Sequence, residues 1–159
     1  MAAGTFQPIR PFSREIFEKG TIALKEDAAQ DFKAGCPLIV AAGYAREVGA
    51  APALIYAIAA EDAHNTVAAG TSDIQVWLVD DQSLWEITLL EAAAVALFAV
   101  AEYGIVEDAG TQTWYASTAD AGDQLSLVRS AETIGGLTAV TDTKTRVLCR
   151  FAAANIQNP

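Results

Sequence analysis

Basic residues are scarce in this chain of 159 residues. Ten Lys and Arg stand against twenty Asp and Glu, which leaves a formal net charge of −10. A nucleic-acid backbone repels such a protein, and no cluster of Lys and Arg in the sequence offsets the repulsion. The composition therefore predicts no direct binding to nucleic acid.

Cysteine and histidine are rarer still, with two Cys and one His. Cys36 and Cys149 are far apart and each lies in an apolar run, so they predict two buried thiols and no disulfide framework. His64 follows Glu61 by three residues, but one His with one carboxylate is not a metal site. We expect His64 to hydrogen-bond local backbone in a turn, and the sequence predicts no bound metal.

Motifs of catalysis and phosphate binding are also missing. Gly135-Gly136 lacks the Lys and Ser/Thr of a phosphate-binding loop, and no GxSxG nucleophile turn occurs. Acidic pairs fall at expected turns, where solvation favours carboxylates, and nothing brings them together: Glu61-Asp62, Asp80-Asp81 and Glu107-Asp108. The sequence therefore predicts a protein that is not an enzyme and that carries no cofactor.

No long hydrophobic run is present. The longest, Ala92–Ala101, is about half of the roughly 20 residues that a membrane-spanning helix needs. Residues 1–17 lack the charged and apolar segments of a secretory leader, and we expect no membrane association. Even so, 52% of the residues are hydrophobic and the mean hydropathy is +0.25. We therefore expect the chain to cover its apolar surface with further copies in a homo-oligomer, most simply a trimer.

Two apolar runs, Pro37–Ala42 and Leu54–Ala60, are central to what is present. Both are rich in aliphatic residues and bounded by Gly and Pro, which favours strands over helices. Gly43 predicts a tight reversal that makes a hairpin of Leu38–Ala42 and Ala45–Val48.

Other segments repeat the strand pattern. Asp73–Asp80 has Ile74, Val76 and Leu78 on one face, and Leu84–Thr88 is predicted as its antiparallel partner. The remaining predicted strands are Thr21–Lys25, Tyr103–Val106, Thr113–Ser117, Gln124–Ser130, Leu137–Val140 and Arg146–Phe151. The turn residues Glu107-Asp-Ala-Gly110 predict that the second and third of these strands form a hairpin.

One segment, Leu89–Tyr103, has the pattern of a helix. Thr88 and Glu91 match a capping box, and Gly104 stands where a glycine commonly follows a helix. The segment is apolar on nearly all sides, so the helix is expected to be buried, although Val95, Leu97 and Val100 also suit a buried strand.

These patterns predict a mainly β protein. We expect an antiparallel β-barrel or sandwich with one short buried helix and an extended N-terminal arm. Residues 1–20 form the arm and residues 21–159 a single β-rich domain, since no internal repeat or low-complexity linker divides the chain.

The arm itself is interrupted by Pro8 and Pro11, which lack an amide donor, so Met1–Phe12 is predicted to form no strand pairing. It carries three apolar anchors at a spacing of three, Phe6, Ile9 and Phe12. We expect these anchors to dock on a neighbouring subunit or partner, and removal of residues 1–12 to leave the fold nearly unchanged. Ser13 is expected to cap a helical turn that runs through Glu18 and stops at Gly20.

Three tryptophans, Trp77, Trp85 and Trp114, lie in or beside predicted strands. Packing in the core or across strands is the simplest role, and a subunit interface is a second. A third is a sugar-stacking platform, in which Trp77 or Trp85 lies near an acidic turn.

The order of elements resembles a known family. A strand written CPLIVAAGYAREV precedes ALIYAIAAEDAHN, a turn at Gly70 and another strand; later come AEYGIVEDAGTQTWYAS and RVLCRF. Over roughly residues 34–151 this order resembles the capsid decoration proteins of tailed phages, also called cement or head-stabilising proteins. The resemblance implies a β-rich protein, often a trimer, without catalytic residues.

This resemblance implies a structural virion protein that is made in the host cytoplasm and binds the outer surface of the capsid. Its partner would be the major capsid protein, whose neighbouring subunits it cements. An acidic protein suits the outer face better than the interior beside packaged DNA. The alternatives are another structural protein of the phage head, neck or tail, and a small carbohydrate- or ligand-binding β-domain.

Overall fold

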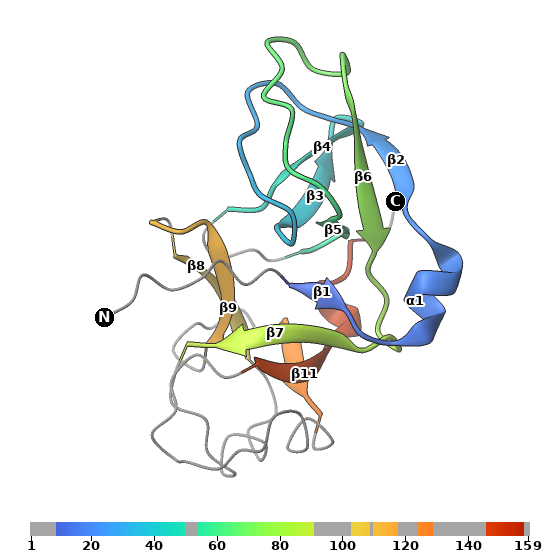
Figure 1. Cartoon of the computed structure of the whole chain (residues 1–159), viewed down its shortest axis with the longest axis vertical. Helices are drawn as coiled ribbons and strands as arrows, with labels where there is room; N and C mark the ends of the chain where they lie inside the picture. The colour runs from blue at the N-terminus through green and yellow to red at the C-terminus, as the bar shows by residue number, and fades with distance from the viewer. Residues whose placement is uncertain are drawn as a thin grey trace.

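The computed structural model describes residues 9–49, 54–90, 103–108, 110–117, 124–128 and 146–157. These residues are mainly β and form two sheets (Figure 1). The first part of the chain contains β1 (Arg10–Pro11), α1 (Arg14–Lys19), β2 (Ile22–Lys25), β3 (Pro37–Ala41), β4 (Tyr44–Glu47), β5 (Ala57–Ala59) and β6 (Asp73–Leu78). The second part contains β7 (Trp85–Leu89), β8 (Gly104–Asp108), β9 (Thr113–Ser117), β10 (Leu125–Leu127), β11 (Arg146–Phe151) and a 3-10 turn, η3 (Ala153–Asn155).

The first sheet has the strand order β2-β6-β5-β3-β4, with every pair antiparallel. The predicted hairpin is confirmed, because β3 pairs with β4 through a two-residue turn at Ala42 and Gly43. Both turn residues have positive φ, 52° and 87°, which matches the twist of the flanking strands.

This sheet curls until its two outer strands approach each other. Glu26, directly after β2, forms a parallel bridge with Ala45 of β4, and the amide of Asp27 donates to the Ala45 carbonyl at 2.9 Å. The five strands therefore make a half-barrel, which forms the upper part of Figure 1. Its interior is apolar: Leu38, Ala57, Ile74 and Val76 share one face of the sheet and are 0% exposed.

The second sheet has the order β10-β11-β7-β9-β8, and β1 pairs with β7 outside this path. The predicted hairpin of β8 and β9 is confirmed, with Asp108 opposite Thr113. The predicted pairing of Asp73–Asp80 with Leu84–Thr88 is wrong, since β6 pairs with β2 and β5 while β7 pairs with β11, β9 and β1. The connection from Asp80 to Leu84 carries the chain into the other sheet instead of reversing it.

The N-terminal arm also differs from the prediction. Ile9 is only 2% exposed and belongs to the core, and β1 pairs antiparallel with β7, with Arg10 opposite Glu86. Strand β9 covers only Thr88 and Leu89 on this edge of β7, so the earlier part of the edge remains open. A two-residue strand is enough to fill it, and proline is tolerated in such a short edge strand.

Helix α1 lies where the sequence predicts a helical turn. Gly20 ends it with φ 72°, and the Gly20 amide donates to the Ile16 carbonyl. Ser13 does not cap the helix, because its hydroxyl accepts from the amide of Leu84 at 2.9 Å. Only Ile16 of this helix is buried, so α1 is a surface helix.

The predicted helix Leu89–Tyr103 lies mostly outside the described residues. Its ends are not helical, since Leu89 belongs to β7 and Tyr103 bridges Leu125. The capping box is wrong at Thr88, which lies inside β7 and whose hydroxyl accepts from Arg146. Within the described residues no helix is long and apolar enough to cross a bilayer.

The C-terminal segment closes one side of the half-barrel. Ile156 bridges Ile55, and the side-chain amide of Gln157 pairs with the backbone of Val40 in β3. The Gln157 carbonyl oxygen accepts from the Val40 amide at 2.8 Å, and its NH₂ group donates to the Val40 carbonyl at 2.7 Å. A side chain thus takes the place of a neighbouring strand.

Candidate functional site

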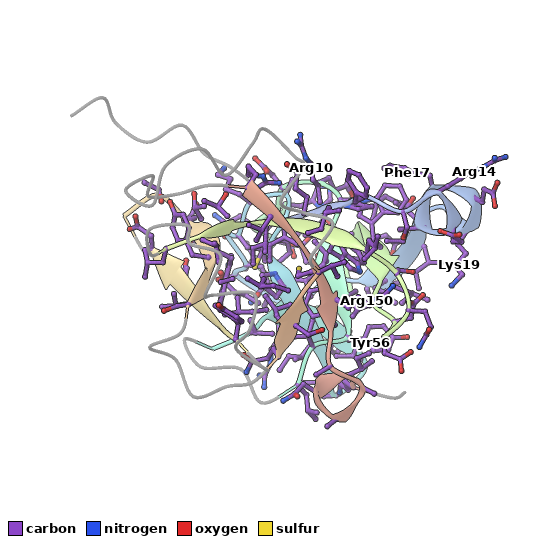
Figure 2. All side chains as sticks on the ribbon, turned by 90° about the horizontal axis from the view of Figure 1, so that it is seen from below. Arg10, Arg14, Phe17, Lys19, Tyr56 and Arg150 are labelled. Carbon is purple, nitrogen blue, oxygen red and sulfur yellow. The ribbon has the colours of Figure 1, made fainter. Side chains whose placement is uncertain are left out.

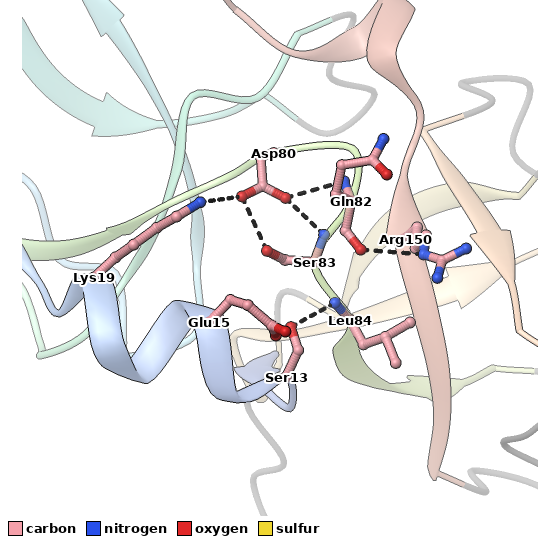
Figure 3. Close-up of a pocket in the computed structure, with 8 residues that line it drawn as sticks. All are labelled: Ser13, Glu15, Lys19, Asp80, Gln82, Ser83, Leu84 and Arg150. Carbon is pink, nitrogen blue, oxygen red and sulfur yellow. Dashed lines mark hydrogen bonds and ion pairs between the residues drawn. The ribbon is translucent and has the colours of Figure 1, made fainter.

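A pocket of about 340 Å³ lies between α1, the β6–β7 connection and β11 (Figure 3). Its lining consists of Ser13, Glu15, Lys19, Asp80, Gln82, Ser83, Leu84 and Arg150. Pockets with convergent polar groups are the usual places for a ligand, so the partners of these groups decide what the pocket can do.

Asp80 organises the pocket. One carboxylate oxygen accepts from the amides of Gln82 and Ser83, at 3.0 and 2.6 Å. The other accepts from the Ser83 hydroxyl and from Lys19, both at 2.9 Å. Partial burial acts to raise the pKa of Asp80, but the bonds from Lys19, Ser83 and Gln82 outweigh it and lower the pKa from 3.8 to about 2.

Replacing Asp80 with Asn should lower the free energy of unfolding by about 1–2 kcal/mol at neutral pH, a value reduced for partial exposure. The carboxylate contributes stability above its ordinary pKa of 3.8 and loses it as the pH falls to about 2, so the deficit should vanish there. Urea unfolding across this range measures the effect. The control is Asp81→Asn at the exposed neighbour, which should stay within about 0.5 kcal/mol; equal losses in both variants would contradict the assignment.

The remaining polar groups of the pocket also serve the fold. The Ser13 hydroxyl accepts from the Leu84 amide, and Arg150 Nε donates to the Gln82 carbonyl at 3.2 Å. The Ser83 hydroxyl donates to Asp80, whose lowered pKa makes this carboxylate a weak base. The pocket therefore fastens α1 and β11 to the connection between the sheets.

Large apolar side chains are exposed on and around α1. We call Phe17, Ile22 and Leu78 the α1 surface; they are 55%, 36% and 41% exposed. Ile22 and Leu78 line a groove of about 210 Å³ together with Ile16, Lys19 and Gly20. The Phe17 ring packs edge-on against Trp77, with ring centroids 5.7 Å apart. Figure 2 shows Phe17 at one end of the molecule with Arg14 and Lys19 of the same helix.

A pair of arginines encloses Glu86 on β7. Arg10 donates to both carboxylate oxygens, at 2.6 and 3.0 Å, and Arg146 Nε donates to Oε1 at 2.9 Å. The Glu86 side chain is 9% exposed and the Arg146 side chain 16%. Burial acts to raise the pKa of Glu86, but the hydrogen bonds from Arg10 and Arg146 outweigh it, so the pKa lies below its ordinary value. This group ties the arm to the second sheet.

The sequence predicted that His64 hydrogen-bonds local backbone, and this prediction is wrong. The His64 amide donates to Glu26, and its ring Nδ1 lies 2.7 Å from Glu26 Oε2. Glu26 is 0% exposed and lies 38 residues earlier in the chain. The sequence held only a weak signal for it: Glu26 follows by two residues Leu24, which packs against the core, and so should point to the same side of the strand.

Carboxylates from different segments influence one another near Cys36. Its Sγ donates to Glu47 Oε1 at 3.4 Å, and burial raises the pKa of this thiol well above its ordinary value. Burial likewise raises the pKa of Glu47, to which Glu107 and Asp31 add. The pKa of Glu107 is raised by burial, Asp31 and Asp108. The prediction that each acidic pair lies at a turn is wrong for Glu107-Asp108, because both residues lie in β8.

Among the described residues, no group of three or more His, Cys, Asp or Glu side chains is placed to hold a metal ion. The two cysteines are buried and unpaired with each other, as predicted. Burial raises the pKa of Cys149 as well, which makes it a poor nucleophile.

The predicted partner-binding anchors do not share one surface. Ile9 is in the core, Phe12 is 46% exposed just before α1, and Phe6 lies outside the described residues. Of the tryptophans, Trp85 and Trp114 are 0% and 2% exposed, so neither offers a stacking platform for a sugar. Phe17, Ile22 and Leu78 were not singled out from the sequence, because single apolar residues in strands and helices are ordinary core candidates.

No protein-family model, curated protein or solved structure matches this chain.

Proposed function

We propose that this protein is a structural component of a tailed-phage virion that binds the outer capsid surface and cements neighbouring capsid subunits. It acts by contact and not by catalysis, and its partner is the major capsid protein. The order of segments from residue 36 to residue 151 motivates the phage assignment. The observation that carries the contact role is the α1 surface, where three large apolar side chains are 36–55% exposed.

Such a surface suits an interface for a physical reason. Exposed apolar groups that gather beside a groove commonly mark a place where another protein docks. Arg14 and Lys19 on the same helix supply a polar rim, which non-obligate interfaces usually have. Copies of the chain form a homotrimer in this proposal, so that several α1 surfaces reach the capsid together and raise the overall affinity.

The net charge of −10 supports the outer face as the location. Packaged DNA repels an acidic protein, whereas the outside of the shell places no such demand on it. The carbohydrate-binding alternative is less well supported, since Trp85 is 0% exposed and Trp77 is covered on one side by Phe17.

The test is co-sedimentation with empty shells assembled from the major capsid protein of the same phage. The wild-type chain should sediment with the shells, and Phe17→Asp should weaken binding about 30-fold, as expected when an interface aromatic worth about 2 kcal/mol is lost. The melting temperature of the variant should stay close to that of the wild type, because Phe17 is largely exposed.

Val67→Asp is the matched control, because it also replaces an apolar side chain by a charge. Val67 is 98% exposed and lies on a loop away from α1. It should bind the shells like the wild type. Failure of the wild-type chain to bind would contradict the capsid assignment. Equal binding by all three proteins would show that the α1 surface is not the interface.

A further inference from the structure

A long loop, residues 60–72, connects β5 to β6 and folds back over the end of β2. Backbone bonds hold it there: the Gly70 amide donates to the Glu26 carbonyl at 2.8 Å, and the Glu26 amide donates to the Ser72 carbonyl at 2.9 Å. Gly70 has φ 77°, and a Cβ at this position would lie 2.9 Å from the ring of Tyr44. The loop therefore packs closely against the half-barrel at this point.

One side-chain contact beneath the loop is unusual. The Glu26 carboxylate is buried, and both of its oxygens are bonded by a single residue, His64. The His64 amide lies 3.0 Å from Oε1 and 3.3 Å from Oε2, and the ring Nδ1 lies 2.7 Å from Oε2. The imidazole is 42% exposed, so it exchanges protons with solvent readily while it holds a buried group.

We propose that Glu26 and His64 form a pH-sensitive latch that fastens residues 60–72 to the half-barrel, tighter when the imidazole is protonated and looser when it is neutral. The latch is a property of the fold and does not depend on the proposed capsid role.

Tautomers explain the difference between the two states. The imidazolium carries a proton on Nδ1 at all times and always donates to Glu26. The neutral ring has a single N–H, which it can place on Nε2 toward solvent; Nδ1 then presents a lone pair to the carboxylate. The charged bond is also about twice as strong as a neutral one.

The groups around His64 act in the same direction. The hydrogen bond to Glu26 raises the pKa of His64, the partial burial of the ring lowers it less, and the charges of Glu26 and Glu61 raise it further. Tyr44 of β4 meets the loop at Gly70. Because the folded pKa is raised, the stabilisation is complete below the pKa of His64 in the unfolded chain. It is lost as the pH rises through the folded value.

The only histidine of the chain makes the test specific. The imidazole C–H resonances should titrate with a midpoint above that of an unstructured peptide containing Asp62–Thr66. Hydrogen exchange of amides in residues 61–71, corrected for intrinsic rates, should become roughly threefold faster between about pH 5.5 and pH 8.5, a small factor because solvent screens the ring.

His64→Asn supplies an uncharged donor near the position of Nδ1 and should abolish this step. Amides of the β3–β4 hairpin in the wild type should show no step and serve as the internal control. Glu26→Gln should bring the His64 midpoint down toward the peptide value. A His64 midpoint equal to that of the peptide would overturn the latch, and so would an exchange step of the same size in His64→Asn. Each variant changes only the contact between Glu26 and His64. If either variant fails to fold, the wild-type titration alone decides.

Discussion

Deletion of residues 1–12 should lower the free energy of unfolding by about 3–5 kcal/mol, the combined loss expected from a buried aliphatic side chain and one partner of a buried carboxylate. Ile9 is 2% exposed and contacts the core. Arg10 donates twice to Glu86, whose side chain is 9% exposed, and β1 completes an edge of β7. Urea unfolding followed by tryptophan fluorescence measures the change.

Single substitutions separate the contributions within the arm. Ile9→Ala should account for most of the loss, about 2–4 kcal/mol, because it leaves a cavity in the core. Phe12→Ala is the matched control at the same end of the chain, since Phe12 is 46% exposed, and should cost no more than about 0.5–1 kcal/mol. A truncated protein with an unchanged unfolding midpoint would mean that the arm is an appendage and not part of the core.

Glu86→Gln should destabilise the protein by about 2–4 kcal/mol at neutral pH, the range for removing one charge from a largely buried ion pair. Arg146, with a side chain 16% exposed, would then lack the carboxylate that it bonds. Burial lowers the pKa of Arg146, and the bond and charge of Glu86 partly restore it. The loss of Glu86 would therefore leave a guanidinium whose desolvation is no longer offset.

Glu47→Gln is the matched control, because it makes the same change at another partly buried carboxylate. Here the ionised carboxylate costs stability. Burial, Glu107 and Asp31 raise the pKa of Glu47, while the hydrogen bond from Cys36 lowers it. The variant should therefore be as stable as the wild type at neutral pH or slightly more so, and a loss equal to that of Glu86→Gln would contradict the distinction.

The two carboxylates also differ in the sign of their pH dependence. The folded pKa of Glu86 lies below its ordinary value of 4.5, so its contribution is present above that value and disappears as the pH falls through the folded pKa. The folded pKa of Glu47 lies above 4.5, so its ionised form costs stability as the pH rises through that region. The deficit of Glu86→Gln should accordingly shrink as the pH falls below 4.5.

Local features of this fold could be predicted from the sequence. The hairpins β3–β4 and β8–β9 are each specified by a turn between two short apolar runs, and both partners lie within a few residues of the turn. Strand β11 was predicted for the same reason, since Val147, Cys149 and Phe151 alternate and all three are buried. Such patterns need no knowledge of distant segments.

Pairings between distant segments could not be predicted in this way. The turn residues at Asp80 indicate that the chain changes direction, but the partners of β7 in the other sheet, β1, β9 and β11, come from distant parts of the chain. The arm was mispredicted because the prolines argue against a long strand, whereas β7 offers an edge for only two residues. Neither fact is visible until the sheets are assembled.

The same limit applies to the candidate sites. Glu26 and His64 are 38 residues apart, and the loop of residues 60–72 brings them together where it folds back over the end of β2. The α1 surface combines a helix with the ends of β2 and β6, so its members share no spacing in the sequence. The acidic character of the chain and the burial of both cysteines, by contrast, follow from composition and neighbouring residues.

The side chain of Gln157 gives the end of the chain a single permitted alignment. It reaches Val40 with both a donor and an acceptor, and no residue beside it can do the same. The side chain of Ile156 has no amide group, and the side chain of Asn158 carries its amide on a chain one methylene shorter. The length of the side chain that must reach Val40 therefore constrains the number of residues between Phe151 and Gln157. The small residues Ala152, Ala153 and Ala154 act mainly as a spacer of fixed length.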